Sequence, residues 1–113
     1  MQEIIISIFE VVGDNLCVTS DNGQKVYERI FDAFNKNRVV ILSFRNISLL
    51  TPTFLNVAIG QLYGKFNEKQ IRTLLKVKNI KLNDLILLQR VVKTAKEYFK
   101  DLQKVNKSIT NII

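Results

Sequence analysis

Short runs of apolar, mostly β-branched residues recur along the 113-residue chain and predict its strands. Residues 3–9 and 38–44 are the clearest of these runs. Residues 73–78 form another, and 16–18 a shorter one that could pair with 3–9 across a turn at 13–15. The unbroken apolar character of 38–44 indicates a central strand that is buried on both faces.

Between these runs, apolar residues return at intervals of three and four, which is helical spacing. This spacing predicts helices over 22–36 and 52–64 and a long last helix over about 83–105. Residues 67–72 are polar, and they could form a turn or a single helical turn. Residues 106–113 are expected to form a short tail after the folded core.

The expected order of elements is strand, short strand, helix, strand, helix, strand, helix, which is an α/β pattern. The strands at 38–44 and 73–78 are joined through a helix, so they should be parallel. We therefore expect a small α/β sandwich, a mixed four-stranded sheet with three main helices. The length fits one domain over 1–113, with a core over about 3–105.

The chain carries little catalytic equipment. It has no histidine, one cysteine (Cys17) and four glycines that form no phosphate-binding loop. The carboxylates form no evident acid/base pair. No enzyme activity, metal or cofactor is expected. The chain has no run of 18 apolar residues and no basic leader after Met1, so we expect a cytoplasmic protein without a membrane span.

The net charge of +7 is unevenly distributed. Residues 1–64 hold five basic and six acidic residues, a net charge of −1, whereas residues 65–113 hold twelve and four, a net charge of +8. The last helix carries an exposed basic stripe, which includes Arg90, Lys93, Lys100 and Lys104. Three interpretations remain open: a solvated face, a site for an acidic protein partner, or a site for nucleic acid.

The junction between strand 38–44 and the following helix is the most informative local feature. Thr51 can cap the helix, and Pro52 at its first position loses no hydrogen bond. In open α/β folds, partners and ligands dock beyond the carboxyl ends of strands. The hydroxyls of Thr51 and Thr53 lie there, either as ordinary cap and first-turn groups or as candidate phosphoacceptors in the field of the helix.

The same junction carries a family resemblance. Residues 39–47 read Val-Val-Ile-Leu-Ser-Phe-Arg-Asn-Ile, and 50–63 read Leu-Thr-Pro-Thr-Phe-Leu-Asn-Val-Ala-Ile-Gly-Gln-Leu-Tyr. Together they resemble the bacterial and phage STAS-like domain family of unknown function, which pairs a hydrophobic strand with a Thr-Ser-Ser-Phe-Leu…Ile-Gly-x-Leu-Tyr helix. The segments at 21–27 and 76–79 also suit this family, and the resemblance extends over about 3–95.

The resemblance implies a fold similar to that of anti-sigma factor antagonists, whose partner is a histidine-kinase-like ATPase. In those relatives a serine at the start of the helix is the phosphorylation switch. By position that serine falls on Pro52, which has no hydroxyl. The acid before it falls on Thr51, the hydroxyl after it on Thr53, and the acid of the preceding strand on Ser43. The helix start could therefore still bind a protein partner, but without a phosphorylation switch at position 52.

These observations predict a non-enzymatic, regulatory interaction module that docks a protein partner through residues 45–56. The expected partner-binding residues are Arg45, Asn46, Ser48, Thr51, Thr53 and Asn56. The alternative function is a nucleic-acid-associated regulator that uses Arg90, Lys93, Lys100 and Lys104. The apolar start of the last helix at 85–88 could also pack on a second copy or on a partner.

Overall fold

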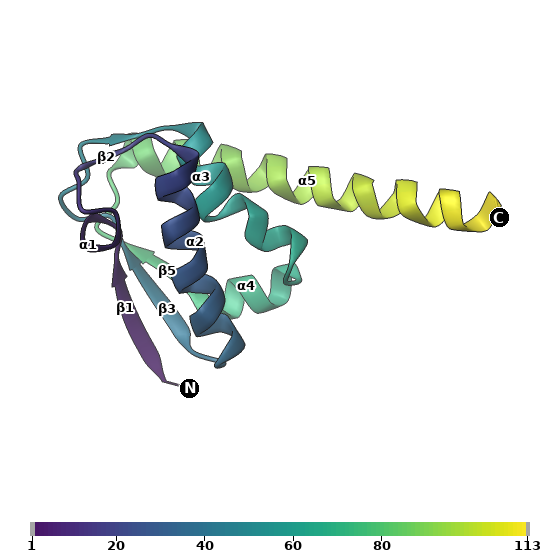
Figure 1. The fold of residues 1–113 in the computed structure, drawn as a ribbon, viewed down its shortest axis with the longest axis horizontal. Helices are drawn as coiled ribbons and strands as arrows, with labels where there is room; N and C mark the ends of the chain where they lie inside the picture. The colour runs from purple at the N-terminus through teal and green to yellow at the C-terminus, as the bar shows by residue number, and fades with distance from the viewer. Residues whose placement is uncertain (1, 113) are drawn as a thin grey trace.

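The computed structural model describes the backbone of residues 2–112 and the side chains of residues 2–104. Its elements follow one another along the chain as shown in Figure 1. They are β1 (Glu3–Ser7), α1 (Ile8–Val12), β2 (Leu16–Cys17), α2 (Ser20–Asn35), β3 (Val39–Ser43), β4 (Leu49–Leu50), α3 (Pro52–Ala58), the 3-10 helix η1 (Gly60–Gly64), α4 (Glu68–Leu74), β5 (Leu75–Lys78) and α5 (Leu82–Ile112).

The strands of the described chain form two separate parallel sheets. The order in the larger sheet is β1-β3-β5, so β3 is central as predicted, and its pairing with β5 is parallel as predicted. The smaller sheet holds only β2 and β4. The prediction of one mixed, four-stranded sheet is therefore wrong, although the α/β class is confirmed.

The short helix α1 explains why β2 does not pair with β1. Residues 8 and 9, predicted to end the first strand, are helical because the Ser7 side chain caps α1 by accepting from the amide of Glu10. Gly13 then ends α1 with a φ of 77°, a left-handed conformation that glycine adopts without strain. The turn of helix carries β2 away from β1, and Asn15 instead accepts from the amide of Ser48, beside β4.

One face of the larger sheet is covered by helices and holds the core. In-register Ile6 and Leu42 point to this face, as does Val40, and all three are almost completely buried. Helix α2 packs on β1 and β3, α3 packs on α2, and α5 packs on α3 and η1. The opposite face is open at the β1 edge, where the Ile5 side chain is 61% exposed.

The two middle helices differ from the prediction in their ends. The helix expected over 52–64 stops at Ala58, and η1 follows it, in part because Gly60 and Gly64 are poor formers of an α-helix. The segment 67–72 is helical, since Asn67 and Gln70 form a reciprocal capping box that starts α4. Because α4 runs to Leu74, the strand predicted over 73–78 begins two residues later than expected.

The last helix is much longer than the body needs. Helix α5 has 31 residues, which corresponds to a length of about 46 Å. Figure 1 shows its yellow end reaching well beyond the other elements. The helix continues through residues 106–112, which were predicted to be a tail. Whether the side chains of that segment dock on the core lies outside the described residues.

Candidate functional site

The loops that follow the strands of the larger sheet meet at one edge of the molecule. Helix α1 follows β1, residues 44–48 follow β3, and residues 79–81 follow β5. Because the three strands are parallel, their carboxyl ends lie together, and this is the edge where open α/β folds bind partners. These segments line an open depression of about 820 Å³. Predicted residues Arg45, Asn46 and Ser48 are among its lining residues.

Ser43 ties two of these loops together. Its buried hydroxyl accepts from the amide of Arg45 at 3.4 Å and from the Asn79 side chain at 3.3 Å. Asn46 and Asn79 both adopt left-handed backbone conformations, with φ of 65° and 58°, which asparagine tolerates better than most residues. The family resemblance implied an acidic residue at the position of Ser43. Here the Ser43 hydroxyl instead connects the loops that follow β3 and β5.

Phe44 and Ile47 anchor the loop after β3. Both side chains are buried in the core, whereas Arg45, Asn46 and Ser48 are exposed. The loop is therefore held by its apolar residues and offers its polar residues to solvent. The Ser48 hydroxyl also accepts from the Asn15 side chain at 3.0 Å, which joins this loop to the segment before β2.

Three exposed apolar side chains lie in or directly after the strands of the smaller sheet, and two of them, Leu16 and Leu49, directly follow residues that line the depression. Leu16 and Leu49 are register partners, and Val18 directly follows the end of β2. These side chains are 38–49% exposed, whereas Cys17 and Leu50 on the other side are buried. We call Leu16, Val18 and Leu49 the apolar ridge. Sequence reasoning missed it, because exposure depends on the pairing of β2 with β4.

Thr51 fastens the start of α3 to the smaller sheet. Its hydroxyl donates to the Val18 carbonyl at 2.8 Å and accepts from the Phe54 amide at 3.2 Å. Its own amide donates to the Cys17 carbonyl at 3.2 Å. Thr51 is thus the helix cap that the sequence predicted, and its hydroxyl is engaged in structure. Thr53, in the first turn of α3, has an exposed side chain.

Close packing between α2 and α3 sets the position of this helix start. A Cβ added to Gly23 of α2 would lie 2.7 Å from the Phe54 carbonyl oxygen and 3.0 Å from the Val57 Cβ. Only glycine permits this approach of the two helices. The Gln24 and Gln61 side chains add a hydrogen bond of 2.9 Å between α2 and η1.

Asn56 is separated from the other predicted residues of the docking surface. It lines a different depression, of about 250 Å³, in which α3 and η1 meet the Tyr98 and Phe99 side chains of α5. The structure therefore brings together Arg45, Asn46 and Ser48 but places Asn56 beside α5. The predicted surface over 45–56 is best described by its first part.

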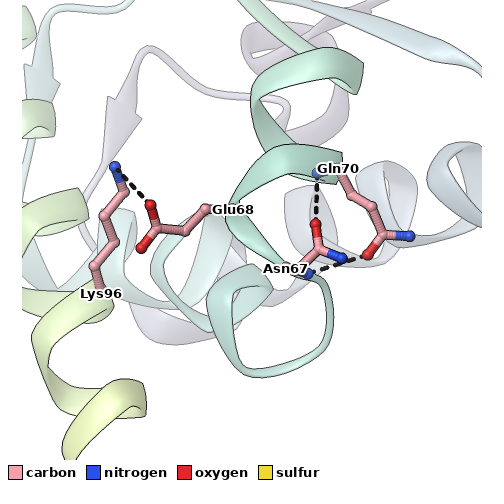
Figure 2. A network of polar contacts seen from close by, with 4 residues as sticks. All are labelled: Asn67, Glu68, Gln70 and Lys96. Carbon is pink, nitrogen blue, oxygen red and sulfur yellow. Dashed lines mark hydrogen bonds and ion pairs between the residues drawn. The ribbon is translucent and has the colours of Figure 1, made fainter.

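The basic residues of α5 form a separate surface. Arg90, Lys93, Lys100 and Lys104 are exposed, and none of them lines the depression at the sheet edge. Lys96, between them, is used within the fold: its ammonium lies 3.7 Å from a Glu68 carboxylate oxygen and 5.8 Å from the centre of the Tyr63 ring. Figure 2 shows this ion pair beside the capping box that starts α4. Anion binding by the four exposed residues stays a prediction.

The thiol of Cys17 is unsuited to nucleophilic chemistry. Its side chain is buried, and burial, with a smaller effect of the Asp14 carboxylate, raises the pKa of Cys17 to about 11. The thiol is therefore protonated at neutral pH. Among the described residues, no group of three or more His, Cys, Asp or Glu side chains could hold a metal ion. Burial and the Glu68 carboxylate also raise the pKa of Tyr63.

Comparisons with known proteins identify the domain through its central part. No helix in the described part of the chain has the length and apolar character needed to cross a membrane. No curated protein and no solved structure matches the chain significantly. The matching segment, residues 22–85, extends from α2 into the start of α5 and includes two of the loops at the sheet edge. It matches the model of the STAS-like domain of unknown function (DUF4325), and the chain belongs to that family.

Proposed function

We propose that this STAS-like domain is a non-enzymatic regulatory module that binds a protein partner at the carboxyl edge of its sheets. The apolar ridge is the observation that carries the proposal. Leu16 and Leu49 are exposed register partners of a small sheet, and Val18, just after β2, is also exposed. The residues before Leu16 and Leu49, Asn15 and Ser48, are held together by a hydrogen bond between their side chains. An apolar centre with a polar rim is the usual composition of a protein–protein interface.

The arrangement suits a protein better than a small molecule. The depression beside the ridge is open and broad, whereas small-molecule sites usually enclose most of their ligand. Arg45 and Lys81 contribute positive charge at its rim, and Asp14 contributes negative charge. A partner that covers the ridge would bury these charged groups only partly. The charges would then influence the orientation of the bound partner more than its affinity.

Family membership suggests the class of partner. Anti-sigma factor antagonists, which STAS-like domains resemble in fold, bind a histidine-kinase-like ATPase through the equivalent junction of strand and helix. We propose the same class of partner here. Because Pro52 lacks a hydroxyl and the Thr51 hydroxyl is engaged with Val18 and Phe54, binding would be constitutive unless Thr53 accepts the phosphate.

A calorimetric titration tests the docking surface. The probe is the histidine-kinase-like ATPase encoded nearest to this chain in its genome. Leu49→Lys, which places a charge on the ridge, should weaken binding by about tenfold or more. Ile5→Lys is the matched control, because Ile5 is also exposed in a strand but lies on the open face of the larger sheet. Equal affinities for wild type and Leu49→Lys, or equal losses in both variants, would refute the assignment.

Incubation with that ATPase and labelled ATP tests the switch separately. Label on the wild type that Thr53→Ala removes would identify Thr53 as the acceptor. Thr51→Ala is the companion variant, and loss of label in that variant alone would contradict our assignment. An unlabelled wild type that still binds the ATPase would support a constitutive module.

A further inference from the structure

Helix α5 carries an apolar repeat that continues past the body of the domain. From Leu88 onward, apolar residues recur at alternating intervals of three and four, which is the heptad spacing of a coiled-coil seam. The repeat is sustained for more than three heptads, and the α5 backbone is helical through Ile112. Its members in the sequence are Leu88, Val91, Ala95, Tyr98, Leu102, Val105, Ile109 and Ile112.

The described part of this seam changes from buried to exposed along the helix. Leu88, Val91 and Ala95 are buried where α5 packs on α3 and η1. Tyr98 is 59% exposed and Leu102 is 41% exposed, although they occupy the same stripe. Figure 1 shows that the C-terminal part of α5 extends beyond the other elements of the described chain.

A close contact with the body lies at the start of the exposed part of the seam. The Phe99 ring lies against Gly64, where an added Cβ would come within 2.5 Å of a ring atom. Leu102 follows Phe99 by less than one helical turn and is already exposed. The domain therefore uses the first part of the seam for its own core, whereas Tyr98 and Leu102, the next two members, are largely exposed.

From Leu88 onward, the basic residues of α5 avoid the seam and its flanks. With Leu88 at heptad position a, the six basic residues from Leu88 to Ile112 in the sequence all fall at the outward positions b, c and f. Asp101, at position g, is the single charged residue of that stretch at a seam or flanking position. The six basic residues are Arg90, Lys93, Lys96, Lys100, Lys104 and Lys107.

We propose that the projecting part of α5, from Tyr98 onward, pairs with the same segment of a second copy of this chain in a coiled coil. A chain with a net charge of +7 can pair with itself only if its cations stay away from the contact, and here they do. A symmetric contact also places identical residues near one another at its axis, which excludes charges from the seam. An acidic partner would be favoured by cations at the flanking positions e and g, and none of the basic residues of this stretch falls there.

This proposal is independent of the docking surface at the sheet edge. It also assigns a place to the second part of the basic stripe, because Lys100 and Lys104 would lie on the outer face of the pair. In that arrangement the ridge of each copy is left available, because it belongs to β2 and β4 and not to α5. A dimeric module would present two docking surfaces.

Sedimentation equilibrium of the full chain, over the widest range of soluble concentrations, tests the pairing. The wild type should approach twice its 13.1 kDa as the concentration rises. Leu102→Glu should raise the dimer dissociation constant by about tenfold or more, because it places a charge in the seam. Gln103→Glu adds the same charge at an exposed outward position and should leave the constant unchanged.

Tyr98→Glu provides a second seam variant, and circular dichroism of every variant shows whether α5 still forms. A well-folded Leu102→Glu or Tyr98→Glu protein that dimerises like the wild type would overturn the proposal. A wild type that stays monomeric at all concentrations would also overturn it, even if another protein later proves to cover the seam. Equal losses in Leu102→Glu and Gln103→Glu would show a general charge effect and overturn it as well.

Discussion

The larger and smaller sheets are built from the same kinds of residue but bury them to different extents. In β1-β3-β5, Ile6 and Leu42 lie under the helices and are almost fully buried. In β2-β4, the register partners Leu16 and Leu49 are half exposed, and only the other side of the pair is buried. The comparison shows that a run of apolar residues is enough to predict a strand. Whether those residues are buried in the core or exposed at a surface depends on the elements that cover the strand.

The largest expected effect tests the covered face of the larger sheet. Leu42→Ala should lower the free energy of unfolding by about 2–5 kcal/mol, because it leaves a cavity beneath the helices. Urea unfolding followed by circular dichroism gives the value. The matched change Leu49→Ala should alter stability by no more than about 0.5 kcal/mol, since that side chain is half exposed. Similar losses of unfolding free energy in the two variants would contradict the difference in burial between the two sheets.

A smaller effect is expected where α2 approaches α3 above the smaller sheet. Replacing a helical glycine by alanine normally stabilises a helix by about 1 kcal/mol. At Gly23 the sign should reverse, and Gly23→Ala should destabilise by about 1–3 kcal/mol, because the new Cβ would lie 2.7 Å from the Phe54 carbonyl oxygen. The exposed neighbour Lys25→Ala is the control. A stabilised Gly23→Ala protein would show that the two helices can separate without cost.

The cap that joins α3 to β2 should contribute about 1–2 kcal/mol. Thr51→Ala removes the hydroxyl that donates to the Val18 carbonyl and accepts from the Phe54 amide. Thr51→Ser should restore most of the loss in urea unfolding. Thr53→Ala, two positions along and exposed, should have little effect on stability. If Thr51→Ala also weakens ATPase binding while Thr51→Ser restores it, the cap positions the ridge.

The smallest effect at neutral pH concerns Cys17, on the buried side of the smaller sheet. Folding raises the pKa of its thiol from 9.0 to about 11, so the protonated form is favoured in the native state. This contribution to stability is complete below pH 9 and is lost as the pH rises toward 11. The native thiol should react with iodoacetamide at pH 8 far more slowly than the urea-unfolded thiol. Comparable rates would mean that β2 has no buried side. In Cys17→Ala, the part of the loss of stability between pH 9 and 11 that comes from this thiol should be absent.

The candidate site was only partly predictable. Arg45, Asn46 and Ser48 follow an evident strand and precede an evident helix cap, so local sequence located them at the sheet edge. The ridge could not be found in this way, because Leu16 and Leu49 are 33 positions apart and their pairing is non-local. Asn56 lies apart from these residues for a related reason: its surroundings depend on where α5 crosses α3.

The same division explains the larger errors of the fold prediction. Residues Ile8 and Phe9 read as the end of a strand, since Ile-Phe-Glu-Val-Val has strong β propensity. The Ser7 cap and the left-handed Gly13 override that preference and make α1. Once α1 forms, β2 cannot pair beside β1, and the four-stranded sheet becomes two sheets.

The sequence by itself determined the α/β class, the central strand, the Thr51-Pro52 helix start and the heptad spacing of the last helix. Each depends on neighbours close in the chain, through capping, propensity and periodicity. Only the tertiary structure decided which apolar residues are covered: Leu42 but not Leu49, and Ala95 but not Tyr98. Burial depends on elements that are distant in the chain, and on the point at which a 31-residue helix extends past the body that supports it.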